Sequence, residues 1–169
     1  MNRLPAALLL TGTLLLMWQS ARARETATAP DFTLLLLRHA EKETGPDPAL
    51  SARGKARAQQ LASELALAPV QAVWSTDTRR TRATAAPLVQ KLQLPLQIYQ
   101  GSELQRFARR LLSDGSNAVV LGHSNTTPEL AALLCQCNTP AISETDYDWI
   151  YQLEVRADTV RFSRYRQTR

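Results

Sequence analysis

The stretch "DFTLLLLRHAEKE" at residues 31–43 decides how this sequence is best interpreted. Residues 32–37 are apolar except for one threonine, which is typical of a parallel strand that is covered on both faces. Arg38 and His39 follow at the carboxyl end of that strand. In open α/β sheets this is the end where ligands bind. The stretch therefore predicts a buried central strand with a functional site beside it.

Strands and helices alternate along most of the chain. After the first strand, further strands are predicted at 70–75, 96–99 and 118–122, and helices at 51–68, 76–93, 102–112 and 127–135. Ser51 is the expected cap of the first helix, and Thr76 and Asp77 favour the start of the second. Two closing strands, at 149–155 and 159–165, flank a tight turn. This order predicts an α/β fold, with a mainly parallel sheet, helices on both faces and an antiparallel edge strand.

Residues 1–23 have the pattern of a secretory signal peptide. An early arginine precedes an apolar stretch at 4–18, and Ala21-Arg22-Ala23 has the small-x-small form of a cleavage site. A retained membrane anchor is the alternative, but this stretch is shorter than the ~20 residues of a spanning helix. We expect cleavage near Ala23, a flexible lead-in at 24–30, one domain at 31–169, and a periplasmic or extracellular protein. The chain would then meet a membrane only through its signal peptide.

The charge distribution narrows the range of partners. The formal net charge is +5, and basic residues are scattered among acidic ones. The sequence shows neither a basic run interleaved with aromatic residues nor a groove-reading motif, so it does not indicate a nucleic-acid-binding protein. A small anionic ligand fits this distribution better, and the oligomeric state is left open.

The two cysteines, Cys135 and Cys137, form a C-x-C pair. An exported protein meets oxidising conditions, but a bridge across one residue closes a very small ring. Two cysteines at the end of a helix are therefore the main expectation. A labile disulfide or a soft-metal contact is the alternative, and a single C-x-C is a weak metal signal.

His39 and His123 are the only histidines, and each directly follows a predicted buried strand. The carboxyl ends of parallel strands meet at one edge of the sheet, so we expect the two rings to converge there. A neutral imidazole can act as a nucleophile. The alternative, that each ring only satisfies a local hydrogen bond, does not explain why both occupy equivalent positions.

Arginines accompany these histidines. Arg38 precedes His39, and Arg79, Arg80 and Arg82 crowd the start of the predicted helix at 76–93. Guanidinium groups and helix N-termini both favour anions, and phosphoryl transfer needs positive donors on the phosphoryl oxygens. A solvated basic helix face is the simpler explanation for Arg82 and for one of the adjacent pair.

Four segments together resemble a known family. They are "LLLRHAEK" at 35–42, "LSARGKARAQQLA" at 50–62, "VWSTDTRRTRATAAPLV" at 73–89 and "VVLGHSNTTPEL" at 119–130. In this order they resemble the histidine phosphatase superfamily, also called the phosphoglycerate mutase-like or histidine acid phosphatase family. The resemblance implies a three-layer phosphoglycerate mutase-like fold, and a phosphatase that forms a phosphohistidine intermediate without a metal ion or other cofactor.

The resemblance also assigns roles to the pocket residues. His39 is the nucleophile that becomes phosphorylated, Arg38 binds the phosphoryl oxygens, and His123 donates to the phosphoryl group. The family places Thr-Ala four and five residues after its second arginine, which selects Arg80, with Arg79 as the fallback in a different helix register. Ser124 is a further candidate for substrate binding.

Two carboxylates are candidates for the proton donor to the leaving oxygen. Glu41 lies two residues after the nucleophile. Glu103 follows the predicted third strand but lacks the flanking Gly and Trp of phosphoglycerate mutase-type members. Family members that carry the acid beside the second histidine have Asp where this chain has Ser124. A substrate with a good leaving group, such as phosphohistidine or an acyl phosphate, would need neither carboxylate.

We therefore expect an exported phosphoric monoester hydrolase that acts on phosphomonoesters or phosphohistidine through His39. The segment between the strands at 96–99 and 118–122 has room for one helix, so the pocket should be open to a phosphorylated small molecule, saccharide or protein. One alternative is a catalytically silent protein of the same fold that binds phosphorylated ligands. Another is a periplasmic metal-binding protein that uses the cysteines and a histidine.

Overall fold

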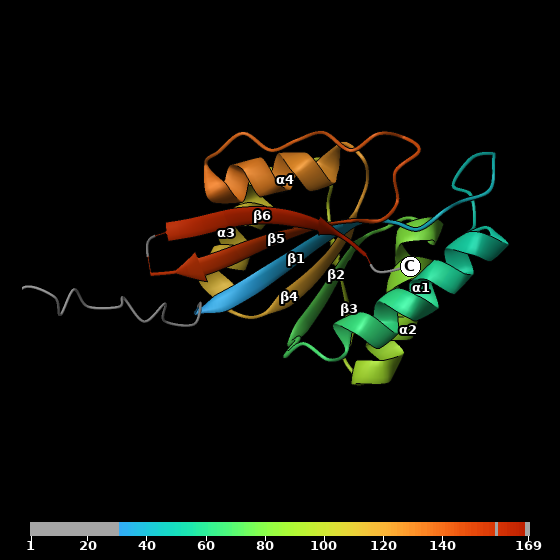
Figure 1. The fold of residues 1–169 in the computed structure, drawn as a ribbon, viewed down its shortest axis with the longest axis horizontal. Helices are drawn as coiled ribbons and strands as arrows, with labels where there is room; N and C mark the ends of the chain where they lie inside the picture. The colour runs from blue at the N-terminus through green and yellow to red at the C-terminus, as the bar shows by residue number, and fades with distance from the viewer. Residues whose placement is uncertain (1–30, 158, 168–169) are drawn as a thin grey trace, which may run out of the picture.

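The computed structural model describes residues 31–157 and 159–167, so the expected signal peptide at 1–23 and lead-in at 24–30 lie outside the described residues. The described elements alternate between strand and helix up to α4 and end in two strands (Figure 1). They are β1 (Phe32–Arg38), α1 (Ala52–Leu65), β2 (Ala72–Thr76), α2 (Arg79–Leu92), β3 (Leu96–Tyr99), α3 (Leu104–Asp114), β4 (Ala118–Gly122), α4 (Thr126–Cys135), β5 (Trp149–Arg156) and β6 (Thr159–Arg166).

The strands form one sheet in the order β3-β2-β4-β1-β5-β6. Strands β1 to β4 are mutually parallel where they pair, whereas β5 is antiparallel to β1 and β6 is antiparallel to β5. The predicted α/β fold, with a mainly parallel sheet and an antiparallel edge, is confirmed. The order also makes β1 and β4 direct neighbours, which brings the two histidine-bearing ends together.

Helices cover both faces of the sheet, α1 and α2 on one side and α3 and α4 on the other (Figure 1). In β1, Leu35 and Leu37 pack into the core beneath α1 and α2, whereas Leu34 and Leu36 pack into the core beneath α3 and α4. All four leucines are buried, and burial of each side chain contributes about 1.5–3 kcal/mol. This two-sided burial explains why the strand is apolar along its length.

The helix starts agree with the sequence at α1 and differ at α2. Ser51 caps α1, and its side chain accepts a hydrogen bond from the Gly54 N–H at 3.2 Å. The start predicted for the second helix at Thr76 and Asp77 is wrong: Thr78 is the cap. Thr76 is instead the last residue of β2, so its backbone belongs to the sheet.

Cys135 ends α4 as expected, and a disulfide joins it to Cys137. Gln136, between them, has a left-handed backbone with φ of 50° and ends the helix. Of the alternatives that the sequence left open, the structure thus contains the disulfide. Both sulfur atoms are then engaged in that bond and are not free to act as soft-metal ligands.

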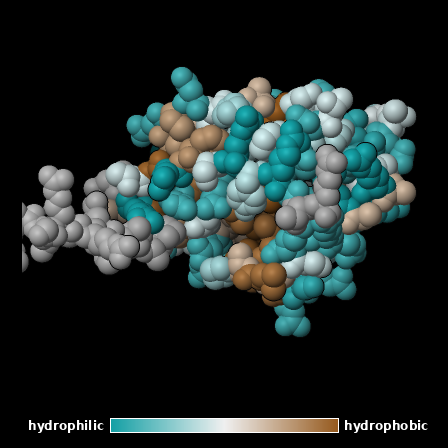
Figure 2. Space-filling model, viewed as in Figure 1, coloured by the Kyte–Doolittle hydropathy of each residue, from teal (hydrophilic) through white to brown (hydrophobic). Residues whose placement is uncertain are grey.

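Most of the face seen in Figure 2 is hydrophilic, and hydrophobic residues reach the surface in a hollow near its middle. Leu67, in the loop after α1, is 90% exposed. None of the helices in the described part of the chain is long and apolar enough to cross a membrane.

We expect Gly54→Ala to destabilise the protein by about 1–3 kcal/mol, the usual cost of overpacking a tight contact. A Cβ at Gly54 would lie 2.0 Å from the carbonyl oxygen of Glu41, so α1 must shift away from the segment that follows His39. At an exposed helical position the same change stabilises a protein by up to about 1 kcal/mol. The sign of the change in the free energy of unfolding therefore shows whether Gly54 is in tight contact with Glu41. Urea unfolding measures it, with Gln59→Ala on the exposed face of α1 as control. Wild-type stability of Gly54→Ala would contradict the contact.

Candidate active site

The two histidines meet at the carboxyl edge of the sheet. Arg38 ends β1 and pairs in register with Gly122, which ends β4. His39 and His123 follow these residues, and the His39 N–H donates to the Gly122 carbonyl at 2.9 Å. Their ring centroids lie 5.5 Å apart in an edge-on arrangement. The predicted convergence of the two histidines is confirmed.

His39 has the protonation pattern of a nucleophile. Its side chain is 2% exposed, and Nδ1 lies 2.7 Å from the carbonyl oxygen of Ala40. A carbonyl oxygen only accepts, so Nδ1 carries the proton and the lone pair of the neutral ring lies on Nε2. Burial, together with the charges of Arg38 and Arg80, lowers the pKa of His39 to about 4. The ring is therefore neutral at physiological pH.

A threonine of α2 fixes the backbone next to this ring. Thr84 Oγ1 accepts a hydrogen bond from the Ala40 N–H at 3.0 Å and donates to the Arg80 carbonyl at 2.7 Å. The Thr84 hydroxyl thus ties the helix that carries Arg80 to the segment that carries His39.

His123 bridges Arg80 and a chain of hydroxyl groups. Its Nε2 lies 2.9 Å from Thr76 Oγ1, and its Nδ1 lies 3.3 Å from Nη2 of Arg80. A guanidinium only donates, so Nδ1 accepts here and Nε2 carries the proton. Burial, followed by the charges of Arg80 and Arg38, lowers the pKa of His123 to about 4. The threonine hydroxyl can accept or donate, so the ring could change tautomer and donate from Nδ1 to a ligand.

The two predicted phosphate-binding arginines converge on these rings. Arg38 is 2% exposed; its Nη1 donates to the carbonyls of Ser143 and Asp146 at 2.9 and 3.0 Å, and its guanidinium carbon lies 4.2 Å from the centre of the Tyr147 ring. The Nε atoms of Arg38 and Arg80 are buried and have no hydrogen-bond partner among the described residues. Buried donors without partners are costly and rare. The pocket is therefore short of acceptors, which suits an anionic ligand.

The other arginines of α2 lie outside this arrangement. The Arg79 side chain is exposed, and its backbone N–H donates to Asp47 Oδ1 at 3.0 Å. Arg82 pairs with Asp77 at 2.7 Å on the surface. Arg80, by contrast, contacts His123 and lies 3.5 Å from Asp47. The choice of Arg80 over the fallback Arg79 agrees with this geometry.

Glu41 is held by arginines. Its two carboxylate oxygens accept from Arg57 at 2.7 and 2.8 Å, and one also lies 2.9 Å from Arg53. Burial alone would raise the pKa of Glu41, but the hydrogen bonds and charge of Arg57, with the charge of Arg53, lower it overall. The Glu41 carboxylate is thus held by two arginines of α1.

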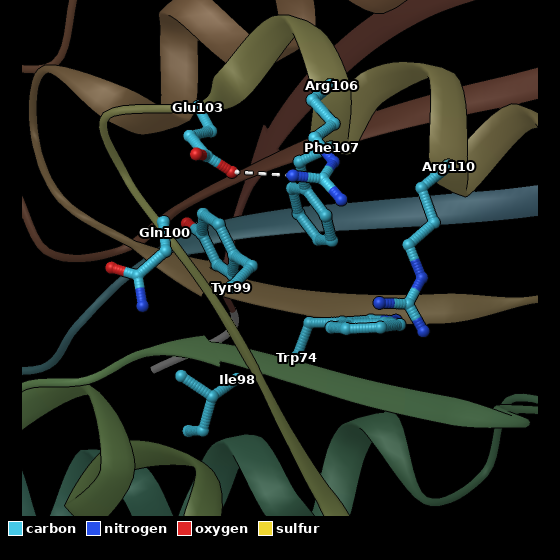
Figure 3. Close-up of a pocket in the computed structure, with 8 residues that line it drawn as sticks. All are labelled: Trp74, Ile98, Tyr99, Gln100, Glu103, Arg106, Phe107 and Arg110. Atoms are coloured by element: carbon cyan, nitrogen blue, oxygen red, sulfur yellow. Dashed lines mark ion pairs between the residues drawn. The ribbon is translucent and has the colours of Figure 1, made fainter.

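Glu103 lines a separate groove of about 280 Å³ along α3 (Figure 3). Its carboxylate lies 3.6 Å from Arg106, and Arg110 stacks on the Trp74 ring at 4.5 Å. The groove is formed by β2, β3 and α3, and neither histidine is among its lining residues. This placement does not favour Glu103 as the proton donor.

Sequence reasoning missed Glu144. Its Oε2 lies 2.7 Å from Nη2 of Arg38, and its Oε1 accepts a hydrogen bond from Ser124 Oγ. Two residues expected to bind the substrate, Arg38 and Ser124, therefore contact the same carboxylate. Glu144 lies in an irregular loop between α4 and β5, where no periodic pattern or motif marks it.

The described residues contain no group of three or more His, Cys, Asp or Glu side chains placed to hold a metal ion. The alternative of a metal site built from the cysteines and a histidine therefore has no support among these residues.

Comparison with known proteins agrees with this fold. The sequence model of the histidine phosphatase superfamily (branch 1) matches residues 34–104, which contain His39 and Arg80. No curated protein matches the sequence. Among solved structures, a mycobacterial glucosyl-3-phosphoglycerate phosphatase superposes with a TM-score of 0.67 at 14% identity, covering 80% of this chain and 99% of that one.

Two further structures are similar. The protein histidine phosphatase SixA, complexed with tungstate, has a TM-score of 0.66 at 16% identity and covers 79% of this chain and 96% of its own. A phosphoserine phosphatase from Entamoeba histolytica, in complex with 3-phosphoglyceric acid, has a TM-score of 0.61 at 14% identity, with coverages of 81% and 98%. The predicted three-layer, phosphoglycerate mutase-like α/β fold is confirmed. The chain is therefore similar to the histidine phosphatase superfamily, in sequence over residues 34–104 and in fold over most of its length.

Proposed function

We propose that this protein is a phosphatase that hydrolyses phosphomonoesters, or phosphohistidine, through a phosphohistidine intermediate at His39. The observation that carries the proposal is a neutral, buried imidazole beside two arginines, each of which has a buried N–H without a partner among the described residues. The His39 imidazole can attack phosphorus, and the Arg38 and Arg80 guanidinium groups can bind the oxygens around it. Similar structures hold tungstate, an oxyanion, and 3-phosphoglyceric acid, a phosphate ester. These ligands support the proposal that this fold binds a phosphoryl group here.

The proposed reaction has two steps. Nε2 of His39 attacks phosphorus, the bond from phosphorus to the leaving oxygen breaks, and its electron pair goes to that oxygen. Water then attacks the phosphohistidine, the N–P bond breaks, and its electron pair returns to Nε2. Arg38, Arg80 and His123 stabilise the negative charge on the phosphoryl oxygens in both steps. Arg38 and Arg80 supply the positive charge that Mg²⁺ provides in other phosphoryl transfer sites, so we propose that no metal ion takes part.

We propose only the chemical class of the substrate. A phosphorylated small molecule, saccharide or protein segment would present its phosphoryl group to Arg38 and Arg80. We also propose export with cleavage near Ala23, since residues 1–23 have the required pattern. The mass of the protein isolated from the periplasm or medium tests this; a chain that retains residue 1 would contradict it.

Phosphate release by the full chain in excess chelator tests the activity, with p-nitrophenyl phosphate and phosphohistidine as substrates. We expect turnover to survive chelation. Quenching with radiolabelled substrate should trap a phosphoenzyme that is labile to acid and stable to alkali, as phosphohistidine is.

Two results would overturn the proposal. Turnover that stops on chelation and returns with added metal would contradict the metal-independent mechanism. Binding of inorganic phosphate without turnover of any substrate would favour the catalytically silent binding protein.

A further inference from the structure

We propose that Glu144 is the catalytic residue that donates a proton to the leaving oxygen and recovers one from the attacking water. The inference rests on the proposed function, which needs such a group whenever the leaving oxygen is an alkoxide. The two carboxylates that the sequence offered for this role lie in other contacts. Glu41 is hydrogen-bonded to Arg57, and Glu103 lines the groove along α3.

Glu144 joins the two chain segments that carry the histidines. Through Oε2 it contacts Arg38, the residue before His39, and through Oε1 it accepts from Ser124, the residue after His123. Arg38 is expected to bind the phosphoryl oxygens, and Ser124 is a candidate for substrate binding, so the carboxylate lies where the phosphoryl group must arrive. A phosphoryl group that takes over both donors displaces the carboxylate to the edge of the pocket, beside the departing oxygen.

The loop around Glu144 is anchored, while the body of its side chain lies in solvent. Ser143 and Asp146 hold Arg38 through their carbonyls, and Asp148 accepts from Arg166 at 2.5 Å. The Glu144 side chain is 76% exposed. Its displacement therefore disturbs little packing and leaves the backbone in place.

The groups facing Glu144 determine when it carries a proton. The hydrogen bond from Ser124, and then the charges of Arg38 and Lys42, lower the pKa of Glu144. In the free enzyme the group is thus a carboxylate at neutral pH. A bound phosphoryl group engages Ser124 and Arg38 and adds negative charge, and both effects raise the pKa again. A phosphomonoester, whose second pKa is about 6, can bring the proton as its monoanion.

Glu144 gains and loses one proton in each of the two steps. The substrate monoanion transfers its proton to the Glu144 carboxylate as it binds. When the bond from phosphorus to the leaving oxygen breaks, the protonated carboxyl group gives that proton to the oxygen, and an alcohol departs. In the second step the carboxylate takes a proton from water as the water oxygen attacks phosphorus, which yields inorganic phosphate and frees His39. Glu144 then loses its proton to solvent.

Single-turnover phosphorylation of the full chain tests the role, because it isolates the first step. We expect Glu144→Gln to slow phosphoenzyme formation from an alkyl phosphate by at least about 100-fold, the usual contribution of general acid catalysis. With p-nitrophenyl phosphate, whose phenolate leaves without a proton, the rate should change less than about fivefold. Hydrolysis of the phosphoenzyme should slow, so that nitrophenol is released in a burst.

Glu43→Gln is the matched control, because it makes the same charge change at an exposed position four residues after His39. It should leave both substrates unaffected. Faster phosphorylation and tighter phosphate binding in Glu144→Gln with both substrates would show that Glu144 only competes for Arg38, and would overturn the proposal. Unchanged rates, or equal losses on both substrates, would also overturn it. Absence of any phosphoenzyme in the wild type would contradict the proposed function instead.

Discussion

Replacing His39 with asparagine is expected to reduce turnover of p-nitrophenyl phosphate by about 10⁴-fold or more. The substitution removes the nucleophile, and loss of a catalytic nucleophile costs up to about 10⁶-fold in enzymes that form covalent intermediates. The amide of asparagine can still donate to the Ala40 carbonyl that Nδ1 of His39 contacts, so the fold should persist. Steady-state kinetics measures the loss, and circular dichroism checks the fold.

His123→Asn is the matched control for this variant. His123 contacts Arg80 and Thr76 but is not the expected nucleophile. We expect a smaller loss, of about 10²–10³-fold, as for removal of one donor to a developing negative charge. The variant should still accumulate an acid-labile phosphoenzyme, whereas His39→Asn should form none. Labelling of His39→Asn would show that another residue is the nucleophile.

Arg80→Ala is expected to lower kcat/KM by about 10²–10³-fold and to weaken inorganic phosphate binding. Its guanidinium lies 3.3 Å from His123, and its Nε is buried without a partner among the described residues. Removal of this side chain leaves the phosphoryl oxygens with Arg38 as their only expected arginine. Competition between phosphate and p-nitrophenyl phosphate measures both effects.

Arg79→Ala removes the same charge from the adjacent position. Its side chain is exposed, and its contact with Asp47 runs through the backbone N–H, which the substitution retains. We expect kcat/KM within about twofold of wild type. If the two variants exchanged their effects, the helix register inferred from Thr84 would be wrong.

Local patterns along the chain were sufficient to predict the order of the strands and helices and some of the residues that line the pocket. The apolar stretch of β1 predicted a strand buried on both faces, because every second residue of a strand faces the same side. The resemblance to the family selected Arg80, because Thr84 and Ala85 follow it at the family's spacing. The Thr84 hydroxyl does link Arg80 to the segment after His39. Such signals depend only on neighbours in the sequence.

The start of α2 and the state of the cysteines needed the structure. Threonine and aspartate at 76 and 77 are good helix caps, but the sheet extends to Thr76 and delays the helix to Arg79. The disulfide depends on the left-handed turn at Gln136. Neither the length of a strand in its sheet nor such a turn follows from local propensity.

The sequence by itself determined the order of strands and helices, the two histidines at strand ends and the arginine that accompanies each. Only the tertiary structure decided which carboxylate faces them. Glu144 and Arg38 are 106 residues apart in the sequence, and an irregular loop brings them together. Glu41, two residues from the nucleophile, is instead held by Arg57 of α1. Ion pairs of this kind depend on the path of loops and on competition among several partners, and neither leaves a periodic trace in the sequence.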